Sequence, residues 1–166
     1  MWDISLTEMV GYLDFESWYQ PDWQQTADRL NAGNKQYADE IRSYKQAYRI
    51  EFEGGLSLFK EEMLQLFKEV DDRGYKNFEK NSENLSKNAR VSNFSKSVRT
   101  LHIGACCHAA VRWDEKRQLT GNDLLDFHHA EAAIGYCSLF LTEKPLKTLV
   151  SQHHLGLIRD FSCAVE

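Results

Sequence analysis

The sequence contains no apolar stretch that approaches the ~18–20 residues needed for a membrane-spanning helix. Its first residues also lack the charged segment and the following apolar segment of a signal peptide. We therefore expect a cytoplasmic protein without a membrane partner. Only four cysteines occur, and their spacing is unlike that of a disulfide-rich secreted scaffold, so we expect free thiols in a reducing compartment.

Several common catalytic motifs are absent as well. The chain has no glycine-rich phosphate loop, no Gly-x-Ser-x-Gly turn and no glycine-framed cysteine nucleophile. Zinc motifs of the Cys-x-x-Cys and His-Glu-x-x-His kinds are also missing. His102 and Cys106 would share one face of a helix, so a zinc site around Cys106 remains a minor alternative to buried structural side chains.

The charge balance restricts the kind of nucleic-acid contact that the chain can make. Twenty basic and 25 acidic residues give a net charge of −5, which argues against a protein that coats nucleic acid generally. Residues 73–99 are an exception, because their basic residues outnumber the acidic Glu79 and Glu83. This segment is either a basic arm that touches phosphates and unpaired bases or an ordinary solvated surface. Its basic residues are Arg73, Lys76, Lys80, Lys87, Arg90, Lys96 and Arg99.

Most of the chain reads as helix. Residues 22–53 are helical in composition, Gly54 and Gly55 are expected to break the pattern, and residues 56–70 form a second amphipathic helix. Residues 98–113 are rich in small residues and predict a buried helix, and residues 145–152 predict a short one. An aromatic stripe at helical spacing is either core or a surface for a protein partner. Its members are Tyr37, Ile41, Tyr44 and Tyr48.

Residues 121–144 combine a helix, a strand and several acids. Asn122 or Asp123 can cap the helix, and Asp126 follows in its first turn, where a carboxylate is favoured. Residues 138–141 form an apolar run typical of a buried parallel strand, and Glu143 follows it. A second strand is expected at residues 162–165. A parallel sheet would bring these acids together, and carboxylate oxygens suit Mg²⁺ or Mn²⁺.

Two stretches carry a resemblance to a known family. The segment Asp126-Phe-His-His-Ala-Glu-Ala-Ala, followed by Tyr136-Cys-Ser-Leu-Phe-Leu-Thr-Glu, resembles the C-terminal half of a PIN-like nuclease domain. The Ser/Thr-containing lead of residues 4–11 is similar to the family's segment before a helical glutamate, here Glu8. The larger bacterial PIN-like proteins are the most similar. They share an Asn-Asp-Leu-x-Asp-Phe-His-His-Ala stretch and a long helical insertion.

The resemblance implies an α/β fold with a small parallel sheet and a large helical majority. Residues 1–166 would form one PIN-like domain, with a helical and basic insertion at about residues 20–98. The implied activity is that of a metal-dependent endoribonuclease acting on single-stranded RNA. Glu8, Asp126 and Glu143 would hold Mg²⁺ or Mn²⁺, with Asp123 as an auxiliary or capping acid. The implied phosphate contacts are Lys87, Arg90, Lys96, Arg99, Arg112 and Lys144.

The chain departs from the family at its N-terminal end. PIN-like domains begin with a central strand that ends in a metal-binding Asp, and only seven residues precede Glu8 here. Lys144 also stands where smaller members have an Asp. We therefore expect an N-terminally incomplete domain, either an active nuclease or an inactive descendant, with an exposed sheet edge or a second chain covering it. The alternative is a non-catalytic helical module that binds a protein partner or a second copy of itself.

Overall fold

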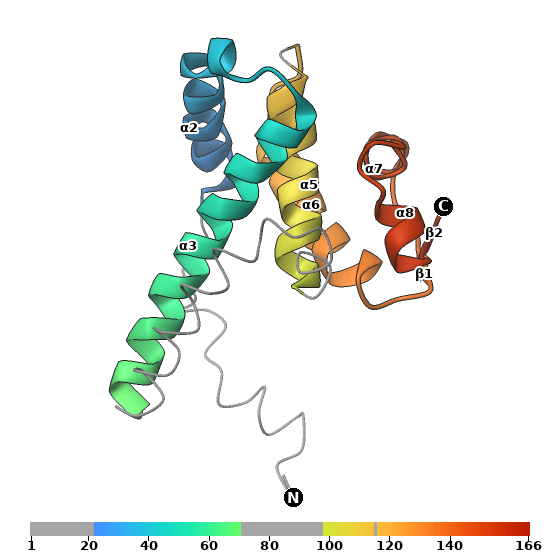
Figure 1. Ribbon diagram of the computed structural model, residues 1–166. Coiled ribbons are helices and arrows are strands. Elements are labelled where there is room, and N and C mark those ends of the chain that lie inside the picture. Colours follow the sequence, from blue (N-terminus) through green and yellow to red (C-terminus); the bar gives the residue numbers. More distant parts are fainter. Residues whose placement is uncertain (1–21, 71–97, 115) are drawn as a thin grey trace, which may run out of the picture.

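The computed structural model describes residues 22–70, 98–114 and 116–166 (Figure 1). The elements are α2 (Trp23–Gln36), η1 (Ala38–Glu40), α3 (Tyr44–Val70), α5 (Arg99–Trp113), α6 (Gly121–Ile134), β1 (Leu139–Phe140), α7 (Lys144–Val150), α8 (Leu157–Phe161) and β2 (Ala164–Val165). The described chain is mostly helical and contains a small parallel sheet, so the coarse prediction of fold class is confirmed. None of the described helices is long and apolar enough to cross a membrane.

The helix break predicted at Gly54 and Gly55 is wrong. Helix α3 runs without interruption through both glycines, and the break lies earlier, between α2 and the first turn of α3 (Figure 1). The reason is tertiary packing, because a Cβ on Gly55 would lie 2.5 Å from Leu101 Cδ1 of α5. A glycine inside a helix costs about 1 kcal/mol relative to alanine, and here it makes room for close packing of α5 on α3.

Helix α5 is the centre of the described fold, which confirms the buried helix predicted at residues 98–113. Nine of its residues are buried, and it packs against α3 and α6. Small side chains such as Ala105, Ala109 and Ala110 allow this close approach on more than one face. The bulkiest fully buried partners include Phe127 and Ile134 from α6. Helix α6 is therefore fixed along its whole length by one apolar face.

A pair of amide side chains from α2 holds the start of α6. The carboxamide of Asn31 makes two hydrogen bonds with the backbone of Leu119, one donated by Nδ2 to the carbonyl and one accepted from the N–H, both 2.8 Å. Gln24 Oε1 accepts from the N–H of Gly121 at 3.0 Å. These side-chain amides satisfy backbone groups of Leu119 and Gly121 that lie outside regular secondary structure or at the helix start. They therefore fix the position of the first residue of α6 relative to α2.

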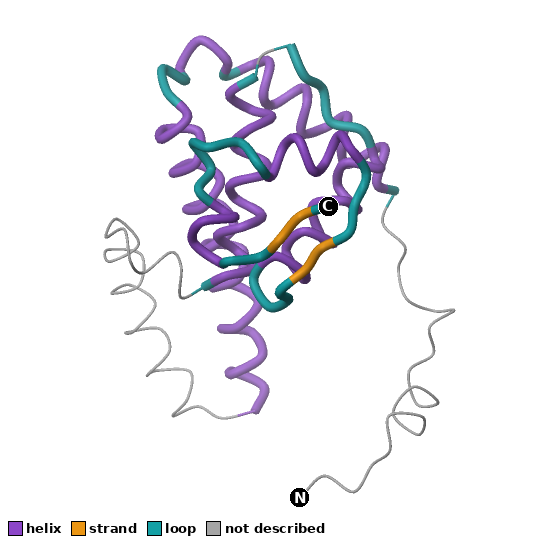
Figure 2. Tube along the Cα trace, turned by 90° about the vertical axis from the view of Figure 1, so that its right-hand side faces the viewer, coloured by secondary structure: helices purple, strands orange, loops and turns teal. Residues whose placement is uncertain are grey.

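The sheet consists of β1 and β2 in parallel, with Leu139 opposite Ala164 and Phe140 opposite Val165 (Figure 2). Val165 is buried and Phe140 packs on the core, whereas Leu139 remains 47% exposed. The expectation that residues 138–141 are buried on both faces is therefore wrong. The cause is that no described element covers the second face, so alternate residues along the strand face solvent.

The backbone of β1 has one bonded side and one open side. Ala164 donates to the Ser138 carbonyl at 2.9 Å, and Glu166 donates to the Phe140 carbonyl at 3.0 Å. Because backbone groups alternate in direction along a strand, those of Leu139 point away from β2. Among the described residues, none forms a further strand on that side. The similarity of residues 4–11 to the family and residues 71–97 of the predicted insertion stay predictions, since residues 1–21 and 71–97 lie outside the described chain.

Candidate acidic site

Thr120 is the N-cap residue of α6, in place of the predicted Asn122 or Asp123. Thr120 Oγ1 accepts from the N–H of Asp123 at 3.2 Å, and Asp123 Oδ2 accepts from the N–H of Thr120 at 2.8 Å. This reciprocal arrangement is a capping box, which satisfies backbone groups that the helix start would otherwise leave unpaired. Sequence inspection overlooked it because Gly121 follows Thr120 and suggested a loop rather than the first helical residue.

Asp123 is also paired with a cation. Arg117 Nη2 lies 2.8 Å from Asp123 Oδ1, and both side chains are mostly buried. Partial burial would raise the pKa of this carboxyl, but the hydrogen bonds from Thr120 and the charge of Arg117 outweigh it and hold the pKa below its usual range. Asp123 therefore has its hydrogen-bonding capacity largely committed to the helix start, which fits the capping alternative for this residue.

Asp126 lies one turn further along α6 and has a different environment. Its pKa is raised, first by partial burial and then by the negative charges of Glu143 and Asp123. The only hydrogen bond that a described residue donates to it is a weak one from Asn122 Nδ2, 3.3 Å from Oδ2. Asp126 is therefore a half-buried carboxylate whose described positive neighbour is His129, which lowers its pKa by less than burial and the two acids raise it.

Glu143 comes from the other side of the site. It occupies the N-cap position of α7, yet its side chain makes no capping hydrogen bond and is exposed. The connection from β1 to α7 carries it close enough to α6 for its charge to act on Asp126. Two of the predicted metal-binding acids thus lie near each other, whereas Glu8 lies outside the described residues. In the described part of the chain, no group of three or more metal-binding side chains occurs.

The predicted phosphate contacts have different surroundings. The guanidinium of Arg112 forms an ion pair with Glu51, and both side chains are at least four-fifths buried. Arg99 donates to the Gly135 carbonyl at 2.6 Å and lies over the ring of Tyr136. Lys144 is exposed and directly follows Glu143. The remaining predicted contacts, Lys87, Arg90 and Lys96, lie outside the described residues.

The histidine and cysteine pair does not resemble a zinc site. His102 Nδ1 is 2.7 Å from the hydroxyl of Tyr48, and His102 Nε2 is 4.0 Å from Cys106 Sγ. Burial raises the pKa of the Cys106 thiol to about 12, and no third metal-binding side chain among the described residues joins the pair. All four cysteines are free, as expected from their spacing. We interpret this pair as a buried structural network between α3 and α5.

The aromatic stripe belongs largely to the core. Ile41 is buried, and Tyr44 and Tyr48 pack against buried residues of the hydrophobic clusters. Tyr37, which is 46% exposed, is the one member of the stripe that lies largely at the surface. The surface that the alternative of a protein-binding module relied on is therefore mostly unavailable to a partner.

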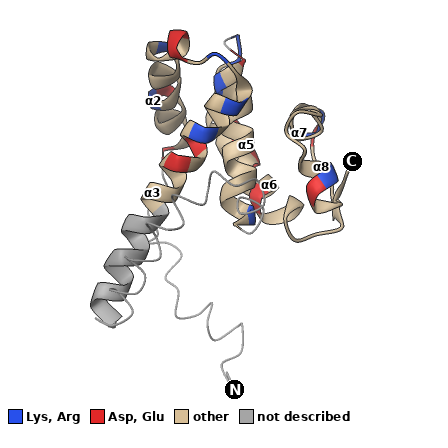
Figure 3. Ribbon diagram, in the orientation of Figure 1, with Lys and Arg blue, Asp and Glu red and all other residues tan. Residues whose placement is uncertain are grey.

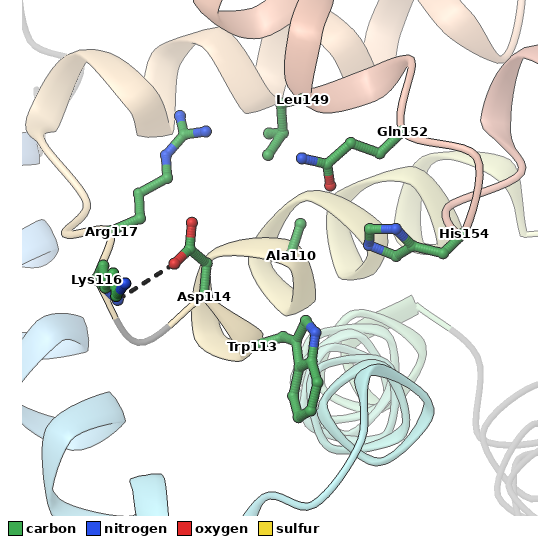
Figure 4. Close-up of a pocket in the computed structure, with 8 residues that line it drawn as sticks. All are labelled: Ala110, Trp113, Asp114, Lys116, Arg117, Leu149, Gln152 and His154. Carbon is green, nitrogen blue, oxygen red and sulfur yellow. Dashed lines mark hydrogen bonds between the residues drawn. The ribbon is translucent and has the colours of Figure 1, made fainter.

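Sequence inspection missed a pocket beside the acidic site. It has a volume of about 500 Å³ and is formed by the end of α5, the connection to α6, the last turns of α7 and the turn that follows (Figure 4). Trp113, Asp114, Gln152 and His154 are among the side chains that line it. No sequence signal could have identified this set, because its members come together only when α5 and α7 pack side by side.

Charged residues of both signs are interspersed over the described helices. In the view of Figure 3, the basic residues of the described part of α3 precede its acidic residues, and both signs occur over the described elements. Comparison with protein-family models, with curated proteins and with solved structures finds no match to this chain. What this chain does is therefore inferred from its own residues and their surroundings.

Proposed function

We propose that this chain is a metal-dependent endoribonuclease of PIN-like type, or an inactive descendant of one that still binds the metal ion. One observation carries the proposal. Asp126 and Glu143, which come from separate elements, lie close enough for the charge of Glu143 to raise the pKa of Asp126. The positive charge of His129 lowers the pKa of Asp126, but the net shift is upward. Two neighbouring negative charges of this kind favour a divalent cation as their partner.

The donor set suits Mg²⁺ or Mn²⁺. Both ions prefer oxygen ligands and are commonly held by one or two carboxylates, with water and substrate phosphate completing the shell. Asp126 and Glu143 would hold the ion, and the hydrogen bond from Asn122 would orient the Asp126 carboxylate. Glu8 would be the third acid. Asp123 would contribute indirectly, because its capping box fixes the turn that carries Asp126.

The chemistry would be hydrolysis of a phosphodiester in single-stranded RNA. A bound Mg²⁺ or Mn²⁺ supplies charge neutralisation at the phosphate and a more acidic water. Lys144, exposed beside Glu143, is the described cation best situated to contact a neighbouring phosphate. Arg112 and Arg99 are already engaged by Glu51 and by the Gly135 carbonyl, so we assign them a smaller share of RNA binding.

A Mn²⁺ titration by isothermal calorimetry tests the metal site. Asp126→Asn and Glu143→Gln should each weaken Mn²⁺ binding by at least tenfold, because each removes one of few charged ligands. Asp39→Asn is the matched control, since Asp39 is an exposed acid in η1, away from the site. If Asp126→Asn binds Mn²⁺ as tightly as the parent, the proposed site is wrong.

Cleavage of single-stranded RNA separates an active nuclease from an inactive descendant. We expect cleavage in Mn²⁺ that stops in chelator and is lost in Asp126→Asn. Binding of Mn²⁺ without cleavage would identify an inactive descendant that has kept two of the family's acids. Cleavage that persists in Asp126→Asn would point to a contaminating nuclease or to another site.

A further inference from the structure

The pocket beside α5 combines a partly exposed aromatic ring with an apolar base. Trp113 is 42% exposed, whereas Ala110 and Leu149 are almost completely buried. Figure 4 shows Ala110 of α5 facing Leu149 of α7, with the indole of Trp113 extending from the last turn of α5 away from Leu149. A planar ring can stack on an exposed indole at the edge of an apolar recess, because stacking removes one face of each ring from water.

The polar side chains of the pocket present both donors and acceptors. The carboxylate of Asp114 faces the same space as the carboxamide of Gln152 (Figure 4). The ring of His154 packs edge-on against Tyr44, with centroids 4.5 Å apart, which restricts its orientation. A carboxamide and a carboxylate are side chains that read the hydrogen-bonding edge of a nucleobase.

The charges of the pocket argue against a phosphate as the main ligand. Arg117 is paired with Asp123 at 2.8 Å, so its charge is already compensated. The backbone N–H of Lys116 donates to Asp114 Oδ1 at 3.2 Å, and the two residues carry opposite formal charges. The charged lining residues Asp114, Lys116 and Arg117 sum to +1, and Asp123, which pairs with Arg117 from outside the lining, brings the sum to zero. A neutral planar ligand with donors and acceptors at its edge fits this balance better than an anion does.

We propose that this pocket binds a nucleobase, with the ring stacked on Trp113 and its edge bonded to Asp114 and Gln152. The volume of about 500 Å³ accommodates a nucleoside and lies within the usual range of ligand pockets, ~300–1,000 Å³. The base belongs either to single-stranded RNA or to a free nucleoside. The RNA source rests on the proposed function, and the base-binding chemistry does not.

Calorimetric titrations in chelator test the inference without metal binding or cleavage. The probes are guanosine, adenosine, cytidine, uridine, ribose 5-phosphate and a short single-stranded RNA. Trp113→Leu should weaken base binding roughly 5- to 150-fold, the range expected for loss of one stacked base. Gln152→Leu should alter the preference among bases. Tyr37→Leu is the matched control, because Tyr37 is a similarly exposed aromatic side chain outside the pocket.

Binding of nucleosides as tightly as RNA would identify a free nucleoside as the ligand, and binding of RNA alone would identify a base within a strand. Either result supports the inference if it requires Trp113. Ribose 5-phosphate that binds as well as adenosine would overturn it, as would parent-like binding by Trp113→Leu. Because these titrations contain chelator and no divalent metal ion, failure of the metal site and failure of the base pocket are distinguishable.

Discussion

The close approach of α2 to the start of α6 gives the sharpest prediction on stability. A Cβ placed on Gly121 would lie 2.9 Å from the backbone nitrogen of Gln24 and 3.1 Å from the carbonyl carbon of Trp23. Ordinary contacts at a Cβ begin near 3.4 Å, so Gly121→Ala requires backbone movement of about half an ångström. Overpacking of this kind typically costs ~1–3 kcal/mol. The same shift would weaken the hydrogen bond from Gly121 to Gln24.

Gly33→Ala is the matched control, because it lies in the same helix pair and has nothing within 4 Å of its added Cβ. The helical preference of alanine should stabilise this variant by up to about 1 kcal/mol. Urea unfolding followed by circular dichroism measures both free energies of unfolding. In thermal melts Gly121→Ala should lower Tm by about 2–12 °C, at ~2–4 °C per kcal/mol for a chain of this size. A Gly121→Ala variant as stable as the parent would refute the described approach of α2 to α6.

Three further predictions concern the charges and thiols. Glu143→Gln should lower the pKa of Asp126, measured by NMR titration, because it removes a negative charge that raises it; an unchanged pKa would mean that the two acids are far apart. Arg112→Ala should destabilise the fold by about 2–4 kcal/mol in urea unfolding, since Glu51 would remain buried without its cation, and an effect below about 0.5 kcal/mol would contradict this. A thiol reagent should label one cysteine, the exposed Cys137, in the native protein and all four in denaturant; rapid native labelling of a second cysteine would contradict the described burial.

Local patterns predicted part of the fold. The buried helix at residues 98–113 followed from its many small residues, and the short helix after residue 144 followed from its local sequence. The failure at Gly55 has a long-range cause, since the position of Leu101 explains the glycine there, whereas a Cβ added at Gly54 would have nothing within 4 Å. The depth of burial of residues 138–141 also depended on what covers the sheet, which local sequence does not specify.

In the candidate site, too, local features could be predicted from the sequence and long-range packing could not. Asp126 and Glu143 could be selected from the sequence, because a helix that packs on the following strand brings its own start beside the end of that strand. The commitment of Asp123 to a capping box with Thr120 was partly visible from the spacing, although Gly121 obscured it. The pocket around Trp113 was invisible, because it forms between helices that are far apart in the sequence.

The pairing of Asn31 with Leu119 has a consequence for the order of folding. The two residues are separated by 88 positions, so their hydrogen bonds form only after a long loop has closed. Contacts of high sequence separation slow folding, because the entropy of loop closure is lost before the contact is made. Helix α6 can begin to form from its own sequence, but its first turn is fixed only once α2 arrives. We therefore expect the first turn of α6, which leads into the turn that carries Asp126, to reach its native geometry late, after α3 and α5 have already paired.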